Sequence, residues 1–451
     1  MTGNQGNIEL RDYQLEAIES FKDKEKGVLK MATGTGKTFT ALSIANETFN
    51  NDNKQFLVIM VPTRDLIIQW VKNFKKFNIK NYLQVDGSNR KWEYELKDSI
   101  WNYNYNFTNR VIVIGTYNSM GLPRFNDILT ENIDRSFLLA DECHNIGLKK
   151  FENCKLVNFQ YRLGLSATPE KWRDYQGNMI IEKYFPNCIL EYSLDKAIDQ
   201  DMLVEYNYYP IVVEFTEDEL ETFENLTNLI RYYMLDKDEN KQQLESLLRR
   251  RAMIVKRAAN KREEFLKILK NKKVFDPSIV FCAPGEEIEI TKSISNLGIK
   301  ANRFTSKIDS KNREKSIELL LSREIDMLVS IKCLDEGVDI PIIKDAYILS
   351  STSNPREYIQ RRGRVLRKSD EKLFANIYDF IVLDENLQDK NFESLANIEM
   401  PRFAEFSDLA RNKYEARSKV RFLLEKRNLL DLIDKKPENT FEESEKENFI
   451  L

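Results

Sequence analysis

The sequence predicts two parallel α/β domains in tandem, with a helical segment between them and a helical extension at the C-terminal end. The chain has 451 residues, which is too long for one ordinary hydrophobic core. In two separate regions, short apolar runs alternate with helix-compatible stretches, as in parallel sheets covered by helices. A long charged stretch without strand patterns separates these regions. We expect the domains and segments to span residues 1–205, 206–273, 274–384 and 385–451.

Composition excludes several classes of protein. A hydrophobic content of 42% suffices for buried cores, and no apolar run reaches the length of about 18 residues expected of a transmembrane helix. Residues 1–9 are polar and have no signal region. The five cysteines are scattered without a Cys-x-x-Cys pair, which favours reduced thiols and no zinc site. We therefore expect a cytoplasmic protein without membrane contact. With a net charge of −3, any nucleic-acid surface must be local.

The first region begins with a predicted amphipathic helix and continues with alternating elements. Gln14 in this helix has an amide that could match both edges of adenine; the alternative is a helix that only packs. Helices are predicted over residues 10–21, 39–49 and 65–77. Apolar runs predict buried strands over residues 28–31, 56–61, 111–115, 137–140 and 162–166.

Residues 32–38, Ala-Thr-Gly-Thr-Gly-Lys-Thr, lie between the first of these strands and a helix. Free N–H groups at the start of a helix, together with the helix dipole, favour a phosphate there. Gly34 and Gly36 let the backbone approach closely, Lys37 supplies charge for the β- and γ-phosphates, and Thr38 supplies an oxygen for Mg²⁺. Met31 stands where the general phosphate-loop pattern has glycine.

Polar clusters follow four predicted strands, at the edge where open α/β sheets bind ligands. They cover residues 62–64, 115–117, 141–144 and 166–169. Asp141 could hold Mg²⁺ through water and Glu142 could orient the attacking water; the alternative is an acidic helix start. His144 is the only histidine of the chain, and its position favours a coupling role over a merely buried one.

The middle segment is charged. A short helix is expected over residues 191–204, a strand over 206–215 and helix over 217–273. Basic clusters occur in the last of these at residues 249–251, 256–257 and 261–262. A solvated helix face and a contact with a phosphate backbone both remain open.

The second region predicts another parallel sheet and has no phosphate loop of its own. Strands are expected over residues 278–282, 326–331, 345–350 and 376–382, and helices over 288–297 and 312–321. Residues 360–367 contain four arginines. If they are helical, Arg364 and Arg367 lie on one side, where they could neutralise a phosphoryl group in transfer; otherwise the run is surface charge.

The C-terminal segment predicts a helix over residues 403–433 and a charged tail over 435–448. Its apolar positions could pack on the second domain or dock a partner. Residues 385–451 contain no convincing nuclease motif, so any cleavage would come from another subunit.

Taken in order, these motifs resemble those of superfamily 2 helicases and translocases over residues 8–384. The Asp-Glu-Cys-His sequence at Asp141, with residues 163–169 and 358–360, is more similar to DNA-repair translocases and to the motor (Res) subunits of type I and type III restriction enzymes than to Asp-Glu-Ala-Asp RNA helicases. The resemblance implies two RecA-like domains with ATP and Mg²⁺ bound between them. In this superfamily Met31 is an ordinary replacement.

The resemblance also implies roles for individual residues. It implies catalysis by Lys37, Glu142, Gln360, Arg364 and Arg367. It implies ATP binding by Arg11, Gln14, Thr33, Gly34, Thr35, Gly36, Lys37, Thr38, Gly337 and Asp339, and metal binding by Thr38 and Asp141. It implies coupling by His144, Ser166 and Thr168, and contacts with a nucleic-acid backbone by Thr63, Arg64, Thr116 and Thr305.

The expected function is a DNA-stimulated ATPase that translocates on, or unwinds, duplex or single-stranded DNA as a motor in restriction, phage defence or repair. RNA is a less favoured substrate, and a nuclease or another subunit could dock on the C-terminal extension. Two alternatives are kept: an RNA helicase, and an ATP-gated clamp or sensor that binds nucleic acid without unwinding it.

Overall fold

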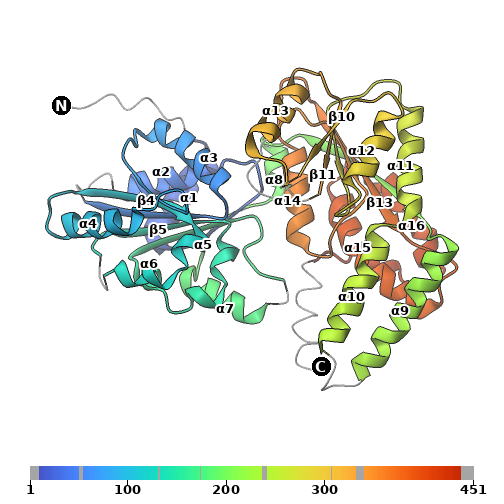
Figure 1. Ribbon diagram of the computed structural model, residues 1–451, viewed down its shortest axis with the longest axis horizontal. Coiled ribbons are helices and arrows are strands. Elements are labelled where there is room, and N and C mark those ends of the chain that lie inside the picture. Colours follow the sequence, from blue (N-terminus) through green and yellow to red (C-terminus); the bar gives the residue numbers. More distant parts are fainter. Residues whose placement is uncertain are drawn as a thin grey trace. The chain divides into compact units, whose positions relative to one another are not determined.

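The computed structural model describes residues 10–49, 54–130, 133–172, 174–235, 241–305, 307–331 and 340–437. The chain divides into two compact units, Met1–Met202 and Leu203–Leu451 (Figure 1). Within the described ranges, no helix is long and apolar enough to cross a membrane.

The first unit is built on a parallel sheet with the strand order β3-β4-β2-β5-β6-β1-β7. Its strands are β1 (Lys26–Met31), β2 (Gln55–Val61), β3 (Leu83–Val85), β4 (Arg110–Thr116), β5 (Ser136–Asp141), β6 (Tyr161–Ser166) and β7 (Cys188–Tyr192). Its α-helices are α1 (Asp12–Lys24), α2 (Lys37–Phe49), α3 (Arg64–Phe74), α4 (Trp92–Asn104), α5 (Tyr117–Met120), α6 (Pro123–Ile128), α7 (Tyr175–Tyr184) and α8 (Leu194–Asp199).

Helices cover both faces of this sheet, as the buried apolar strands require. The chain moves one way along the sheet from β1 to β2 and β3, and the other way from β3 onward. Right-handed crossovers therefore place α2 and α3 on one face and α5 to α7 on the other (Figure 1). Every residue of β2 is buried, in keeping with a central parallel strand. The parallel α/β architecture predicted from the sequence is confirmed.

The second unit contains another parallel sheet, with the order β10-β11-β9-β12-β13-β8. Its strands are β8 (Glu205–Val213), β9 (Ser278–Phe281), β10 (Ala301–Phe304), β11 (Met327–Ser330), β12 (Asp345–Ile348) and β13 (Phe374–Val382). Its α-helices are α9 (Glu217–Leu235), α10 (Lys241–Lys256), α11 (Ala259–Asn271), α12 (Glu287–Ser295), α13 (Ser310–Leu321), α14 (Pro355–Val365), α15 (Asp389–Asp408) and α16 (Lys413–Glu425).

Several elements differ from the sequence prediction. The expected helix over 191–204 shrinks to α8, because Glu191 and Tyr192 belong to β7, which pairs with β1. β8 precedes the charged middle segment and is the edge strand of the second sheet, paired with β13 along nine residues. The helical run over 217–273 is three helices, of which α9 and α10 share a small apolar cluster of Leu226, Ile230 and Leu247.

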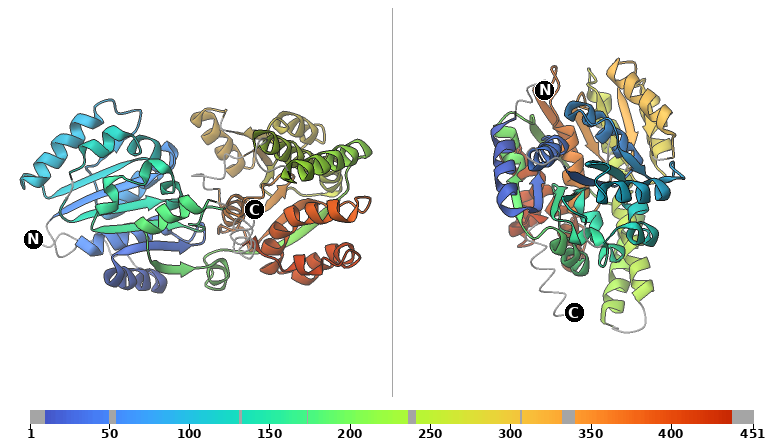
Figure 2. Two further views of the ribbon diagram at one scale, coloured as in Figure 1. Left: turned by 90° about the horizontal axis from the view of Figure 1, so that it is seen from below. Right: turned by 90° about the vertical axis from the view of Figure 1, so that its left-hand side faces the viewer.

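The C-terminal helices α15 and α16 pack against the second sheet, on the side of β8 (Figure 2). Phe392, Phe403 and Phe406 of α15 are buried. Tyr414 and Phe422 of α16 remain largely exposed, at 88% and 69%. The extension therefore packs as part of the second unit and still presents aromatic side chains outward. Residues 438–451, which hold most of the predicted charged tail, lie outside the described residues.

A buried cluster of charges joins α15 to β13 and β8. Arg402 donates to Asp379 Oδ2 from Nε at 2.8 Å and to Glu399 Oε2 from Nη2 at 3.0 Å. The Tyr208 hydroxyl donates to the same Asp379 oxygen at 2.9 Å. The two carboxylates hold the pKa of Arg402 well above its ordinary value although burial opposes this. Because all of these groups are buried, each charge depends on its partners.

Arg402→Met is expected to lower the free energy of unfolding by about 3–5 kcal/mol, because Asp379 and Glu399 would stay buried without their guanidinium partner. Urea denaturation of the variant measures this loss. Arg421→Met, at an exposed position of α16, is the matched control and should change stability by less than about 0.5 kcal/mol. Equal stability of the two variants would contradict the role given to the cluster.

Candidate ATP-hydrolysis site

The phosphate loop connects β1 to α2 and is shaped by two left-handed glycines. Gly34 and Gly36 have φ angles of 92° and 84°, a region that residues with a Cβ rarely adopt. Thr35 Oγ1 donates to the carbonyl of Ala32 at 2.7 Å, which closes the loop on itself. α2 begins at Lys37, so the free N–H groups of its first turn face the loop. Met31 is fully buried and pairs with Tyr192, so its role is to fill the core at the end of β1.

Helix α1 contacts the loop and α2 through two neighbouring side chains. The Tyr13 hydroxyl donates to the carbonyl of Thr35 at 2.8 Å. Gln14 Nε2 donates to Thr40 Oγ1 at 3.1 Å, and Gln14 Oε1 accepts from the Arg11 N–H at 3.0 Å. Gln14 thus lies beside the phosphate loop, with its amide bonded to the protein itself. Tyr13 was not singled out from the sequence, since nothing separates it from an ordinary apolar-face residue.

Two consecutive carboxylates follow β5 next to the loop. The Lys37 ammonium lies 3.7 Å from Glu142 Oε1. Glu142 has a φ of 48° and a ψ of 59°, a left-handed conformation that is costly for a residue with a side chain. Strained backbone of this kind is found often at functional sites. In this conformation the Glu142 carboxylate faces Lys37.

Asp141 is buried and is oriented by an indole. Trp70 Nε1 donates to Asp141 Oδ2 at 2.8 Å, and the Tyr117 hydroxyl donates to the Asp141 carbonyl at 2.8 Å. Burial and the neighbouring Glu142 raise the pKa of Asp141 to about 6, although Trp70 and Lys37 oppose this rise. No sequence signal identified Trp70 as the group that orients Asp141, because its contact depends on how α3 packs.

The pKa of Asp141 predicts a pH-dependent stability difference. A carboxyl that titrates at about 6 when folded, instead of at 3.8, contributes stability below pH 3.8 and loses it as the pH rises through 6. Without metal or nucleotide, Asp141→Asn should therefore be more stable than the parent protein at pH 8, by up to about 3 kcal/mol. The gain should shrink toward pH 4. Urea denaturation in EDTA measures it, and Asp98→Asn on the surface of α4 is the control. A pH-independent difference would contradict the prediction.

Three further predicted residues lie around Glu142. Ser166 Oγ donates to Glu142 Oε2 at 3.4 Å, and His144 Nδ1 lies 3.5 Å from the same oxygen. The Thr168 N–H donates to Ser166 Oγ at 3.1 Å. The ends of β5 and β6 thus converge on one carboxylate, from which contacts lead to Lys37 on one side and to Thr168 on the other.

The predicted nucleic-acid residues of the first unit lie further along the same sheet edge. Val61 and Thr116 are register partners at the ends of β2 and β4. Thr63 accepts from the Leu66 N–H at the start of α3, and Thr116 accepts from the Ser119 N–H at the start of α5. Arg64 Nε lies 3.1 Å from Asp86 Oδ2. The two threonines therefore cap helices, and the Arg64 guanidinium is oriented by Asp86.

In the second unit, α14 carries the arginine run, and the structure separates its members. Arg361 and Arg362 are buried: Arg361 lies over the Phe281 ring, and Arg362 pairs with Glu405 and donates to its carbonyl at 2.7 Å. Arg364 is partly exposed. The helix ends at Val365, before Arg367, so the condition under which Arg364 and Arg367 would share one helix face is not met. Arg367 instead forms an antiparallel bridge with Leu203.

The remaining predicted residues of this unit are scattered. Gln360 is buried within α14, and Thr305 is buried directly after β10. Gly337 and Asp339 lie outside the described residues. The basic clusters of α10 and α11 do not form one solvated face. Arg251 is half-buried and donates to Ser394 Oγ at 3.1 Å, while Arg249 pairs with Glu245 on the surface.

The first unit fits ATP with Mg²⁺. Lys37 Nζ and Thr33 Oγ1 are buried beside the loop and make no hydrogen bond in the described part of the chain, so donors remain for phosphate oxygens. Thr38 at the start of α2 and Asp141 at the end of β5 supply the hard oxygen donors that Mg²⁺ prefers.

Comparison with known proteins agrees with this architecture. The family described as "Type III restriction enzyme, res subunit" matches residues 7–171, and "Helicase conserved C-terminal domain" matches residues 260–369. The chain is 27% identical over 395 residues to a "DNA 3'-5' translocase XPB2" of Sulfurisphaera tokodaii, covering 81% of this chain and 80% of that protein. It is 26% identical to "Putative helicase 22" of a Sulfolobus islandicus filamentous virus, covering 83% of this chain and 64% of that protein.

Solved structures show the same fold at lower identity. The "ATP-dependent Type ISP restriction-modification enzyme LlaBIII bound to DNA" matches with a TM-score of 0.60 and 18% identity, over 90% of this chain and 31% of that one. The chain thus spans most of one relative and only part of others. The chain therefore carries a domain of the type III restriction enzyme res-subunit family followed by a helicase C-terminal domain, and it is an ATP-hydrolysing enzyme of the helicase type.

Proposed function

We propose that the protein couples ATP hydrolysis to movement along DNA, as the motor of a restriction, phage-defence or DNA-repair system. The observation that carries this proposal is the set of contacts around Glu142. Its carboxylate lies near Lys37 of the phosphate loop, and Ser166 and His144 contact its other oxygen. Glu142, which would respond to the γ-phosphate, is thereby linked to the ends of β5 and β6.

In this mechanism Lys37 and the first-turn N–H groups of α2 hold the phosphates, and Thr38 and Asp141 would hold Mg²⁺, which neutralises charge on the phosphate oxygens when bound. Glu142 orients the attacking water and accepts its proton. His144 and Ser166 contact the Glu142 carboxylate, so their contacts would change when its charge or position changes during hydrolysis. Thr168, bonded to Ser166, carries the change to the loop after β6.

The second unit would complete the reaction. Gln360, Arg364 and Arg367 are proposed to act on ATP when the units close, with the two arginines stabilising charge on the transferred phosphoryl group. ATP then favours a closed state and its products an open one, because a ligand shifts such an equilibrium only by binding the two states differently. Thr63, Arg64, Thr116 and Thr305 are proposed to follow the DNA backbone.

The experiment compares ATP hydrolysis without nucleic acid and with duplex DNA, single-stranded DNA or RNA, and adds a triplex-displacement assay for movement. We expect several-fold stimulation by DNA, little by RNA, and displacement that requires ATP. Stimulation by RNA alone would instead identify an RNA helicase. Tight ATP-dependent binding without displacement of triplex or duplex strands would identify a clamp.

The family that matches residues 7–171 is described as a restriction-enzyme subunit, which supports a partner that supplies other activities. The exposed Tyr414 and Phe422 of α16 are candidates for contact with such a subunit. Pull-down of the partner with the parent chain, and its loss with Tyr414→Ser and Phe422→Ser together, would support this part of the proposal.

A further inference from the structure

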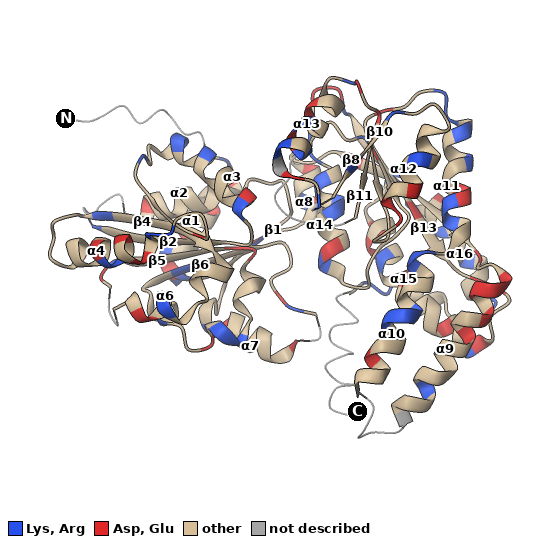
Figure 3. Ribbon diagram, viewed as in Figure 1, with Lys and Arg blue, Asp and Glu red and all other residues tan. Residues whose placement is uncertain are grey.

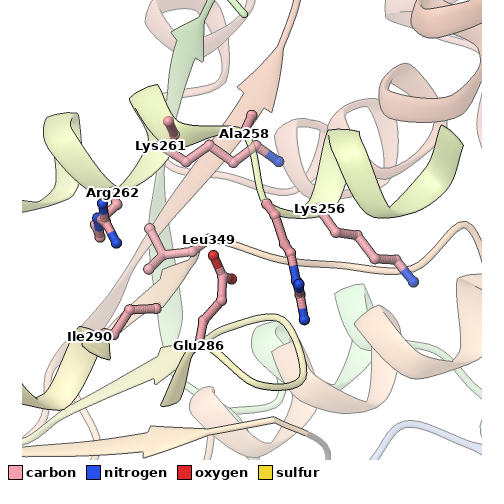
Figure 4. A pocket seen from close by; sticks show the side chains of 9 residues that line it. Lys256, Ala258, Lys261, Arg262, Glu286, Ile290 and Leu349 are labelled. Carbon is pink, nitrogen blue, oxygen red and sulfur yellow. The ribbon is translucent and has the colours of Figure 1, made fainter. Parts of the chain in front are cut away.

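A small pocket in the second unit lies where the helices α10 and α11 meet the carboxyl end of β9 and β12. Its volume is about 80 Å³, well above the roughly 10–15 Å³ that one water requires. Most of its polar lining is basic. The lining includes Lys256, Arg257, Lys261, Arg262, Glu286 and Leu349 (Figure 4).

The pocket lies at a topological switch point of the sheet. β9 and β12 are neighbours, and the chain leaves β9 toward β10 at one edge but leaves β12 toward β13 on the other side. Glu286 lies five residues after the end of β9 and Leu349 directly follows β12, and both line the pocket. The pocket therefore lies at the carboxyl ends of these two strands. In open α/β sheets, the crevice outside the carboxyl ends of such strands is where ligands bind.

Lys261 is the feature that points to an anion. Its side chain is only 4% exposed and extends from α11 along one side of the pocket (Figure 4). In the described part of the chain, no group hydrogen bonds or ion-pairs with its ammonium. Burial lowers the pKa of Lys261, while the charges of Glu399 and Glu286 act in the opposite direction. A buried ammonium has three donors to satisfy, and the oxygens of an anion would satisfy them.

The surroundings add to this preference. α11 starts at the pocket, its N-cap is Ala258, which has no side-chain acceptor, and its first turn contains no acidic residue. Glu219 accepts from the Ala259 N–H at 3.0 Å, so part of the helix end is already capped. Arg262 pairs with Glu289, and Arg257 donates to the carbonyl of Pro284. Figure 3 shows Lys and Arg along α11 and at the end of α10. The local charge and the helix dipole therefore both favour a negative group.

We propose that this pocket binds a phosphate group, with Lys261 as its principal donor and Lys256 at its rim. We assign that phosphate to the backbone of the nucleic acid, an assignment that rests on the proposed function. The other possible source is a free phosphate ion. The same chemistry serves both, because each offers several anionic oxygens to an ammonium.

The test uses the full chain with Lys261→Met, Lys256→Gln and, as a matched control at the exposed far end of α11, Lys270→Met. The affinity for a single-stranded DNA oligonucleotide is measured against salt concentration. The slope of log K against log salt should become shallower by about 0.7 in each pocket variant, the value for one lost phosphate contact, and should not change in the control. Unfolding midpoints are compared in inorganic phosphate and in chloride at equal ionic strength. Phosphate should stabilise the parent protein and the control, but not Lys261→Met.

The possible outcomes distinguish a backbone phosphate from a free phosphate ion, and they distinguish failure of the pocket proposal from failure of the proposed function. A shallower DNA slope in the pocket variants supports a backbone phosphate. Loss of phosphate stabilisation without a change in slope supports a site for the free ion. If the pocket variants match Lys270→Met in both measurements, the pocket holds only water and the inference is overturned. If the parent chain binds no DNA, the proposed function fails, while the phosphate measurement still tests the pocket. The unfolding midpoint of each variant in chloride shows whether that variant is folded. If Lys261→Met does not fold, Lys256→Gln still tests the pocket, because Lys256 is partly exposed and its substitution should leave the fold intact.

Discussion

ATP hydrolysis by Lys37→Ala is expected to fall by at least about 10²–10³, because the variant removes a preorganised positive group at the phosphate loop. The Lys37 ammonium is buried, makes no hydrogen bond in the described residues, and has Glu142 as a charge partner 3.7 Å away. It is therefore available for phosphate oxygens. Steady-state phosphate release with saturating nucleic acid measures the loss, and ATP affinity should weaken in parallel.

The matched control is Lys30→Ala. Lys30 lies on β1, one residue before Met31, and pairs with the half-exposed Glu191 at 3.4 Å. Its variant should hydrolyse ATP at the parent rate. Glu142→Gln adds a second comparison, because it keeps the shape of the side chain and should retain ATP binding while hydrolysis is lost. Undiminished hydrolysis in Lys37→Ala would show that the site has been wrongly assigned.

Arg364→Ala is expected to lower kcat by about 10³ or more, the range found when an arginine that stabilises a transferred phosphoryl group is removed. Among the arginines of α14, Arg364 is partly exposed, whereas Arg361 and Arg362 are buried against Phe281 and Glu405. Arg356 at the start of α14 is partly exposed as well, and of the two it is Arg364 that matches the helicase motif, so Arg364 is the one proposed to act on ATP. ATP binding should change much less than kcat.

Arg362→Ala gives the opposite pattern. It leaves Glu405 without its partner and opens space beside Phe406, so it should destabilise the second unit by about 3–5 kcal/mol. Arg421→Ala, on the exposed side of α16, should affect neither stability nor kcat. If Arg364→Ala lost stability and not rate, Arg364 would be a structural residue and the proposed role would fall.

The sequence was sufficient to predict those strands whose apolar runs are long and regular. β2, β4, β5 and β6 were predicted nearly to their ends, because buried parallel strands read as continuous apolar runs. β3 and β10 were missed. Each is short, and each lies at the edge of its sheet, where part of the strand is only half-buried. β7 was not predicted, and its last two residues were assigned to a helix, since its pairing with β1 leaves no local signal.

Site residues that are close in sequence could be predicted, and contacts between residues distant in sequence could not. The neighbours Asp141 and Glu142 could be placed from the strand that precedes them, and the glycines of the phosphate loop from their spacing. Contacts that depend on tertiary packing could not be foreseen. Trp70 reaches Asp141 across the space between α3 and β5, and Tyr13 reaches Thr35 from α1. The sequence also contained no sign that α14 ends before Arg367, because neither Leu366 nor Arg367 is a helix-breaking residue such as glycine or proline.

The buried pairing of Arg362 with Glu405 has a consequence for the modularity of the protein. Arg362 is on the same helix as Arg364, and Glu405 is on α15, beyond the boundary where a minimal two-domain motor would be cut. A truncation after residue 384 would expose the apolar faces that α15 covers and leave the Arg362 guanidinium without its carboxylate. The C-terminal helix α15 thus stabilises α14, the helix that carries Arg364. Engineers who seek a smaller ATPase from this chain should shorten it after α16 and not before α15.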